Sequence, residues 1–359
     1  MLTFKIENGL GVFVPVDQDE ADRQEERLRD LVLSVGSGEM ELEKAAAQVR
    51  EMIKKDELFL KGYPLLAEML SGDDDEGSEE VYLEGYRAAL KILPKDFNGP
   101  MDAENADVQC FLRCHTGYVE SLTVKNKYKE AIEATGRQLV FDPGDMFERE
   151  RELGEMYIMD GQYDQARRIL EEQAKSRSTA LYSLAYLDFL AEKYAEAAAR
   201  LRQAFILAPY TADFVTGRMT SPNLFWQAGP RAPQYQDELM YVESLGGEIW
   251  TVDNEALAFI EWLSQTSAAL GDRAAMVAVS EKSFIAGQPG DKEAEEFMAL
   301  WTKAGQVSKD LVKMVKNPET GDLIHPWELL AAYHESLSEE HDFFAHGDDC
   351  DCGCGDHKH

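Results

Sequence analysis

The stretch STALYSLAYLDFLAEKYAEAAARLRQAFILAPY, residues 178–210, decides the fold. Small side chains at Ala185 and Ala197 would let two helices approach each other closely, and Pro209 would end the second helix. The large and small residues that set this pattern are Leu181, Leu184, Ala185, Ala197, Leu201, Ala204 and Pro209. The stretch therefore predicts two packed helices joined by a short turn.

The same pattern occurs twice upstream, which indicates an internal repeat. Residues 147–177 carry it at Leu153, Gly154, Tyr157, Ala166 and Leu170. A more degenerate unit keeps Tyr118, Leu122, Ala131 and Pro143 but has Val119 and Gln138 where small residues are expected. The pattern resembles the tetratricopeptide repeat (TPR), and three units are about the minimum for a self-supporting stack. We therefore predict an all-α protein with a TPR-like right-handed helical solenoid over residues 105–316.

Other segments complete the predicted domain organisation. Residues 1–16 alternate apolar and polar residues around Asn8-Gly9, which is typical of a β-hairpin. Helical spacing predicts an N-terminal helical cap over 17–104, with helices at 19–35, 39–55, 57–70 and 79–93. Further helices are predicted at 253–270, 272–287, 291–305 and 308–316. Prolines, glycines and aromatic residues in 210–250 predict an ordered inserted loop. The C-terminal segment 317–345 is predicted to begin with a turn-rich break at 317–326 and to continue as a helix over 326–345, with Pro326 at its first position, before a flexible tail, 346–359.

Four stretches between residues 142 and 263 resemble a known family. They are DPGD (142–145), APYTADFVTG (208–217), DELMYVESLGGEIW (237–250) and EALAFIEWL (255–263). This part of the chain is similar to the TPR proteins related to the suppression-of-tumorigenicity protein. The resemblance implies a helical scaffold and transfers no catalytic residue.

The net charge limits which kinds of partner the protein can bind, and other sequence features indicate its compartment. Lys and Arg number 36 and Asp and Glu 68, so the formal charge is −32. This balance argues against a nucleic-acid binder and against docking on an anionic membrane. The first residues do not follow the pattern of a signal peptide, and charges interrupt every apolar run short of the roughly 18 residues of a membrane helix. Five cysteines make a disulfide framework improbable, so we expect a cytoplasmic protein with reduced thiols.

The C-terminal tail, HDFFAHGDDCDCGCGDHKH, concentrates metal-ligating side chains. Three thiols alternate with Asp and Gly, so they start on one face of an extended chain, and the glycines would let the chain curl around one ion. Zn²⁺ takes four such ligands, which three thiolates and one imidazole would supply; Cu⁺ and Ni²⁺ remain alternatives. The candidate ligands are His341, His346, Cys350, Cys352, Cys354, His357 and His359. The competing interpretation is a disordered acidic tail whose Cys and His are incidental.

The run Cys350-Asp-Cys352-Gly-Cys354-Gly also resembles the start of the zinc-binding tail of the SecA-type preprotein translocase ATPase. In that family a second ligand pair follows about eight residues later. Here the chain ends first, and His357 and His359 stand closer. The resemblance implies a truncated zinc-binding tail.

Other candidates for chemistry have a structural alternative that we favour. Cys110, Cys114 and His115 lie within one helical stretch and could serve a nucleophile, but cysteine also packs well between helices. His334 lies on an apolar stripe, which favours a satisfied histidine over a ligand. The aromatic residues Trp226, Tyr235, Tyr241, Trp250 and Trp262 could line a peptide groove, although packing is the simpler role. The acidic run 71–80 is typical of a solvated loop, with weak Ca²⁺ binding as the minority interpretation.

The sequence contains no phosphate-binding glycine loop, no nucleophile elbow and no zinc-protease motif. We therefore expect a non-enzymatic protein–protein interaction scaffold, which binds a protein or peptide partner and carries a metal-binding tail. The alternative is a metal-handling protein, a chaperone or sensor, in which the solenoid positions that tail.

Overall fold

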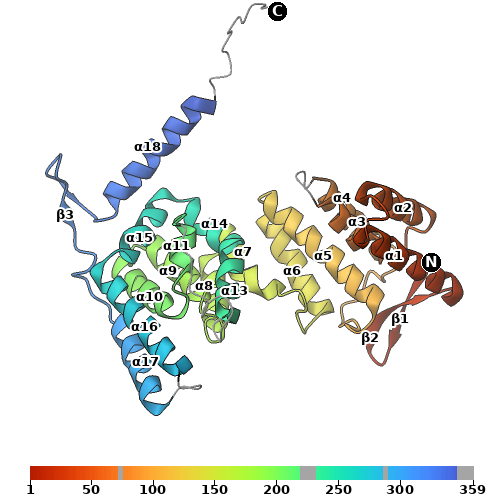
Figure 1. Ribbon diagram of the computed structural model, residues 1–359, viewed down its shortest axis with the longest axis horizontal. Coiled ribbons are helices and arrows are strands. Elements are labelled where there is room, and N and C mark those ends of the chain that lie inside the picture. The colour runs from red at the N-terminus through yellow and green to blue at the C-terminus, as the bar shows by residue number, and fades with distance from the viewer. Residues whose placement is uncertain (72–75, 219–231, 286–289, 346–359) are drawn as a thin grey trace, which may run out of the picture. The chain divides into compact units, whose positions relative to one another are not determined.

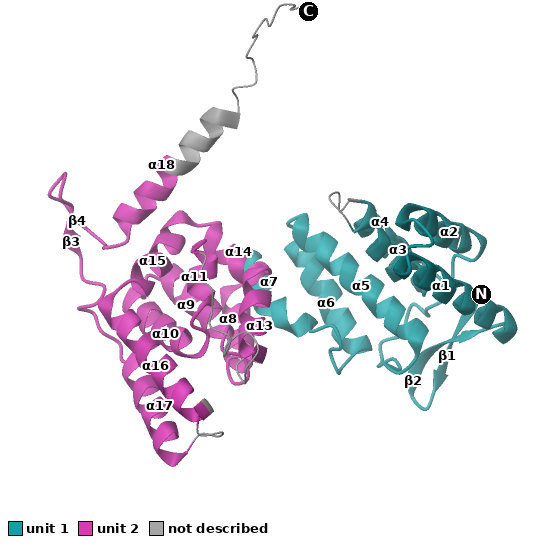
Figure 2. Ribbon diagram, in the orientation of Figure 1, with its two compact units in different colours: residues 1–160 teal, residues 161–359 magenta. Residues whose placement is uncertain are grey.

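The computed structural model describes residues 1–71, 76–218, 232–285 and 290–345. These residues are mostly helical, as predicted, and none of their helices is long and apolar enough to cross a membrane. The chain divides into two compact units, Met1–Asp160 and Gly161–His359 (Figures 1 and 2). The division falls inside the predicted repeat 147–177, at the turn between its two helices.

The first unit begins with a two-stranded antiparallel hairpin, β1 (Leu2–Glu7) and β2 (Leu10–Pro15). Asn8 and Gly9 make its turn with φ of 52° and 83°, the left-handed backbone that a two-residue hairpin turn needs. The predicted N-terminal hairpin is therefore confirmed. The helices that follow are α1 (Gln18–Gly36), α2 (Leu42–Lys55), α3 (Gly62–Leu70), α4 (Glu76–Leu90), α5 (Ala106–Val124), α6 (Tyr128–Phe141) and α7 (Leu153–Met159), with a 3₁₀ turn at Arg149–Glu152.

The hairpin is fixed to the helical part through β2. The Gly11 amide donates to the Pro100 carbonyl, and the Gly11 carbonyl accepts from the Asp102 amide, both at 2.9 Å. A Cβ at Gly11 would lie within 3 Å of the Phe4 and Phe97 rings, so only glycine fits. The hairpin thus covers one end of the apolar core of the first unit.

Asn105 joins this hairpin to α5. Its side-chain oxygen caps the helix by accepting from the Val108 amide at 3.0 Å. Its side-chain nitrogen donates to the Phe13 carbonyl of β2, also at 3.0 Å. One amide side chain therefore starts a helix and holds a strand against it.

The second unit is built from shorter helices and a second small hairpin, β3–β4. Its elements are α8 (Tyr163–Gln173), α9 (Ala180–Leu190), α10 (Tyr194–Leu207), α11 (Thr211–Val215), α13 (Ala232–Val242), α14 (Leu245–Thr251), α15 (Asn254–Ser264), α16 (Ser267–Ile285), α17 (Asp291–Ala304), β3 (Val315–Lys316), β4 (Leu323–Ile324) and α18 (Glu328–Ala345). Helices α9 and α10 pack along each other, and α16 packs on α17 (Figure 1).

The turns of the three predicted repeats share one backbone geometry. Asn126, Gly161 and Glu192 each adopt a left-handed conformation, with φ of 56°, 73° and 58°. Each stands two residues before a tyrosine that begins the next helix, and five before an alanine. Those alanines, Ala131, Ala166 and Ala197, are all fully buried. The repeat is therefore visible in local structure as well as in sequence.

Ala185 and Ala197 were the residues predicted to stand between α9 and α10, and both are completely buried. This burial confirms that bulk is excluded there. The whole of α9 is nearly enclosed, since its residues from Ala180 to Phe189 are all buried.

Replacing Ala197 by Leu should lower the free energy of unfolding by about 1–3 kcal/mol, because the larger side chain forces close-packed neighbours apart. Urea unfolding followed by circular dichroism measures the change. Ala191→Leu, at an exposed position after α9, is the control and should change stability by less than about 0.5 kcal/mol. Equal stability of the two variants would contradict the repeat register.

The segment 210–250, predicted as an inserted loop, instead contains α11, α13 and α14. The proline and glycines that suggested a loop instead allow helices to start or to pack closely. Pro233 stands in the first turn of α13, where a missing amide costs nothing. A Cβ at Gly246 would meet the Tyr241 ring at 2.4 Å, and one at Gly247 would meet the Val242 carbonyl at 2.2 Å. The loop interpretation was therefore wrong for the described part of this segment.

One further prediction near the C-terminus was wrong, since residues 308–316 form turns and then β3 instead of a helix. The predicted break at 317–326 and the helix after it are confirmed, because α18 begins at Glu328. The Asn317 amide donates to the Asp322 carbonyl at 2.8 Å and closes the hairpin turn of this break. Gly321 supplies the left-handed residue of that turn, with φ of 81°.

Candidate functional site

The predicted metal-binding tail lies beyond the part of the chain that the structure describes. The residues outside it are His346, Cys350, Cys352, Cys354, His357 and His359. His341 falls within α18, but its side chain is not among those described. In the described residues, no group of three or more His, Cys, Asp or Glu side chains is placed to hold a metal ion.

Trp327 anchors the helix that leads to the tail. Its side chain is fully buried directly before α18. The indole stands edge-on to the Phe259 ring at 4.8 Å and to the Tyr194 ring at 4.9 Å. Its Nε1 donates to Glu255 Oε1 at 3.3 Å. An indole held by both packing and a hydrogen bond fixes the start of α18 against α10 and α15.

Two histidines complete this anchor. The His325 ring stacks on Trp327 at 4.5 Å, and its amide donates to Glu328 Oε1 at 2.7 Å, which caps α18. His334 Nε2 lies 2.9 Å from Glu261 Oε2, so it links α18 to α15. His334 is therefore satisfied, as predicted, but it is half-buried at the edge of the core and its neighbour Tyr333 is exposed.

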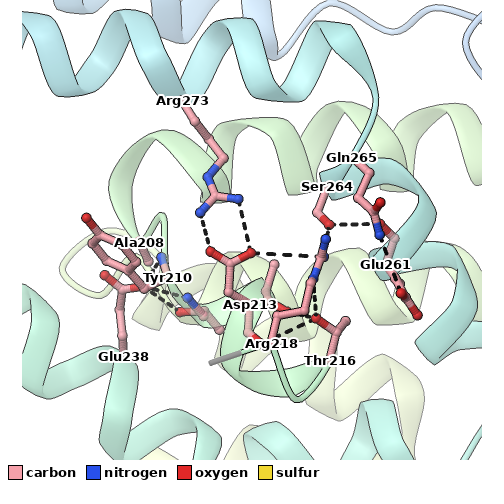
Figure 3. Close-up of polar contacts among 12 residues, drawn as sticks. Ala208, Tyr210, Asp213, Thr216, Arg218, Glu238, Glu261, Ser264, Gln265 and Arg273 are labelled. Carbon is pink, nitrogen blue, oxygen red and sulfur yellow. Dashed lines mark hydrogen bonds and ion pairs between the residues drawn. The ribbon is translucent and has the colours of Figure 1, made fainter. Parts of the chain in front are cut away.

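A polar cluster of buried and half-buried residues, which we call the polar centre, lies around α11 (Figure 3). It consists of Asp213, Arg218, Glu238, Ser264 and Arg273. The Arg273 guanidinium makes a two-pronged ion pair with the Asp213 carboxylate, at 3.2 and 2.5 Å. Arg218 Nη2 donates to Ser264 Oγ. These bonds tie α11 to α15 and α16.

Glu238 ties α13 to the beginning of α11. Its Oε2 accepts from the Tyr210 and Thr211 amides, each at 2.7 Å, and from Thr211 Oγ1 at 3.0 Å. Its Oε1 is buried and has no hydrogen-bond partner in the described part of the chain. Burial raises the pKa of Glu238 to about 8, although the three hydrogen bonds act in the opposite direction. The carboxyl group is therefore largely protonated at neutral pH.

The polar centre holds the fold together and does not resemble a reactive site. Arg273 pairs with Asp213, Arg218 donates to the hydroxyl groups of Thr216 and Ser264, and Glu238 accepts from Tyr210 and Thr211 at the start of α11. A buried network of this kind fixes which helices meet, since each partner removed leaves a costly unpaired group.

The Cys110, Cys114 and His115 group lies in α5, inside the first unit. Burial raises the pKa of Cys110 to about 12 and that of Cys114 well above its usual value. Burial lowers the pKa of His115 to about 3, and its ring stacks on Tyr86 at 4.5 Å. The thiols remain protonated, so they lack the thiolate that a nucleophile requires. The geometry favours the packing interpretation.

The aromatic residues of 210–262 mostly pack where the structure describes them. Tyr241 and Trp250 are buried, and Trp250 Nε1 donates to the Tyr241 hydroxyl at 3.3 Å. Tyr235 lies edge-on to Tyr210 at 6.3 Å, and Trp262 contacts Trp327 at 5.4 Å. Trp226 lies outside the described residues.

Comparison with protein-family models, with curated proteins and with solved structures finds no match to this chain. The resemblances to the TPR proteins and to the zinc-binding tail therefore stay predictions.

The Glu238 pKa makes stability depend on pH. Since the pKa is raised from 4.5 to about 8 by folding, the folded state binds this proton more tightly than the unfolded state. Its contribution is complete below the unfolded pKa and is lost as the pH rises through about 8. The wild type should lose roughly 4 kcal/mol of stability from this group between pH 5 and 9, whereas Glu238→Gln cannot ionise and should not show this loss.

Urea unfolding at pH 5, 7 and 9 measures this difference. Glu243→Gln, at an exposed position just after α13, is the matched control and should follow the wild-type profile. A Glu238→Gln variant with the same pH profile as the wild type would show that this carboxyl does not hold a proton in the folded state.

Proposed function

We propose that this protein is a non-enzymatic scaffold that binds a protein partner and carries a metal-binding C-terminal tail. The helical fold and the excess of acidic residues are consistent with a protein-binding role. Burial raises the pKa of the Cys110 and Cys114 thiols, so these residues lend no support to an enzymatic role. The observation that carries the proposal is the clustering of seven metal-ligating residues in the last 19 positions.

Thiolate and imidazole groups in the tail are suitable ligands for a Zn²⁺ ion. Cys350, Cys352 and Cys354 would supply three thiolates, and His357 or His359 would supply an imidazole. A bound Zn²⁺ would contribute ordering free energy that this segment, rich in Asp and Gly, lacks the apolar surface to obtain by packing. His341 and His346 are further candidate ligands.

Metal analysis of the purified chain tests this site. We expect about one Zn²⁺-class ion per chain, as in other four-ligand structural sites. Binding should weaken below about pH 6, where protons compete for thiolate and imidazole. Replacing Cys350, Cys352 and Cys354 by Ser should abolish tight binding and leave the helical circular-dichroism signal and the melting temperature nearly unchanged.

Cys110→Ser with Cys114→Ser is the matched control, because it removes two thiols elsewhere and should keep the ion. A triple variant of the tail that still holds a stoichiometric ion would show that these thiols are not the ligands. A triple variant that unfolds would show that the tail belongs to the core.

The alternative function is metal handling, as a metal chaperone or sensor. The anchoring of α18 by Trp327 favours it, because a fixed helix would hold the tail at a defined place on the second unit. Affinity capture with the intact and tail-truncated chains distinguishes the two functions. A scaffold keeps its partner without the tail, whereas a metal-handling protein loses it.

A further inference from the structure

A pocket, which we call the α1–α2 pocket, lies between the first two helices of the first unit (Figure 1). Leu31 of α1 and Val49 of α2 belong to the apolar core of this unit. Toward the start of α1 the space between the helices widens to about 450 Å³, a volume typical of a site for a small organic molecule. The residues that line it are Met1, Glu20, Arg23, Gln24, Arg27, Met52, Lys55 and Asp56.

Helical spacing brings the cationic side chains of the α1–α2 pocket together. Arg23 and Arg27 are four residues apart, so they lie on one face of α1. Lys55 comes from the last turn of α2. Met52, three residues before Lys55, is only 5% exposed and gives the pocket an apolar wall. Three basic side chains and one apolar side chain from two helices therefore line one concave space.

Both carboxylates that line the pocket already have cationic partners. Glu20 Oε2 accepts from Arg23 Nε at 3.1 Å and from Arg23 Nη2 at 2.7 Å. The Asp56 carboxylate accepts from the Met1 amino group and, at 3.1 Å, from the Leu58 amide. Arg23 and the Met1 amino group are thus balanced within the pocket.

The other two cations of the pocket have no acidic partner among the residues that the structure describes. Arg27 Nη2 donates only to the uncharged Gln48 side chain, with 3.5 Å between Nη2 and Oε1. Lys55 makes no ion pair in the described part of the chain, since the nearby Glu51 bonds to Lys54 at 2.7 Å. The α1–α2 pocket therefore carries two positive charges that no carboxylate balances, in a chain whose formal charge is −32.

We propose that the α1–α2 pocket binds a small phosphorylated molecule, a phosphomonoester. A phosphate ester carries about −1.5 to −2 charges at pH 7 on one group, which matches the two unpaired cations, whereas a single carboxylate would balance only one of them. The planar Arg27 guanidinium can donate two parallel hydrogen bonds to phosphate oxygens, and Lys55 adds a point charge. Met52 and the Gln24 amide are left to contact the organic part of the ligand. This site lies outside the tail and depends on neither function proposed above.

The charges around the pocket favour a small ligand over an extended polyanion. The rest of α1 exposes Asp19, Asp22 and Glu26, which do not line the pocket. A nucleic acid or an anionic membrane would meet these carboxylates as well as the cations. A small ligand inside the pocket contacts Arg27 and Lys55 directly, while charges beyond about 8 Å are largely screened at physiological salt.

Isothermal titration calorimetry of the full-length chain with phenyl phosphate tests this site. Benzoate, which has the same ring and a single negative charge, is the reference ligand. We expect phenyl phosphate to bind about tenfold more tightly than benzoate or better, because it engages both cations. Its affinity should fall as the pH decreases through about 6, where the phosphate takes up its second proton.

The double variant R27Q and K55Q should weaken the binding of phenyl phosphate by about tenfold or more. Gln24→Glu is a second variant, which keeps both cations but adds a negative charge to the pocket wall and should also weaken binding. The matched control is R29Q with K129Q, because these two cations are exposed, have no acidic partner in the described residues and lie outside the pocket. The control should keep the wild-type affinity within about twofold, which separates local contact from net charge. Circular dichroism checks that each variant is folded.

Four results would overturn the proposal. They are no binding of phenyl phosphate at millimolar concentration, equal affinity for phenyl phosphate and benzoate, equal affinity of the wild type and the R27Q, K55Q variant, or binding of a phosphoserine peptide or a single-stranded oligonucleotide without binding of phenyl phosphate. None of these results affects the metal analysis or the partner capture described above.

Discussion

Two helices of a pair can lie against each other only where no bulky side chain separates them. Ala185 and Ala197 meet this constraint between α9 and α10, and both are completely buried. The left-handed residue that precedes α10, Glu192, turns the chain within a few residues so that the contact can form. Helices α8, α14, α15, α16 and α17 pack against this pair, and the Trp327 anchor contacts Tyr194 of α10.

Sequence patterns predicted the parts of the fold that local rules control. Asn8-Gly9 determines a tight hairpin turn, and the small residues at Ala185 and Ala197 determine helix contact. The segments predicted wrongly are those whose residue types are compatible with two different structures. Gly246 and Gly247 looked like loop residues, but they let α14 approach Tyr241 and Val242. Residues 308–316 have apolar spacing that suits a helix, whereas the Asn317 turn makes them part of a hairpin.

Among the site residues, some roles could be predicted from residue type, whereas others depend on contacts that form only in the folded chain. Cys110, Cys114 and His115 could be assigned to packing from their residue types, and burial of their side chains agrees. The buried role of Glu238 could not be foreseen, because its partners at Tyr210 and Thr211 come together only after α11 and α13 pack. A single acidic residue in a helical stretch carries no signal of that tertiary contact. Pro326 indicated a helix start beside Trp327, but the partners of Trp327, Tyr194 and Glu255, could not be foreseen for the same reason.

Hydrogen–deuterium exchange of the full chain with and without equimolar Zn²⁺ tests the central claim most directly. The helices pack around their own buried residues, whereas we propose that the tail gains order from a metal. Zn²⁺ should therefore slow amide exchange in residues 341–359 and leave the exchange of α9, α10 and α15 unchanged. No slowing in the tail, or slowing throughout the helices, would contradict the proposal.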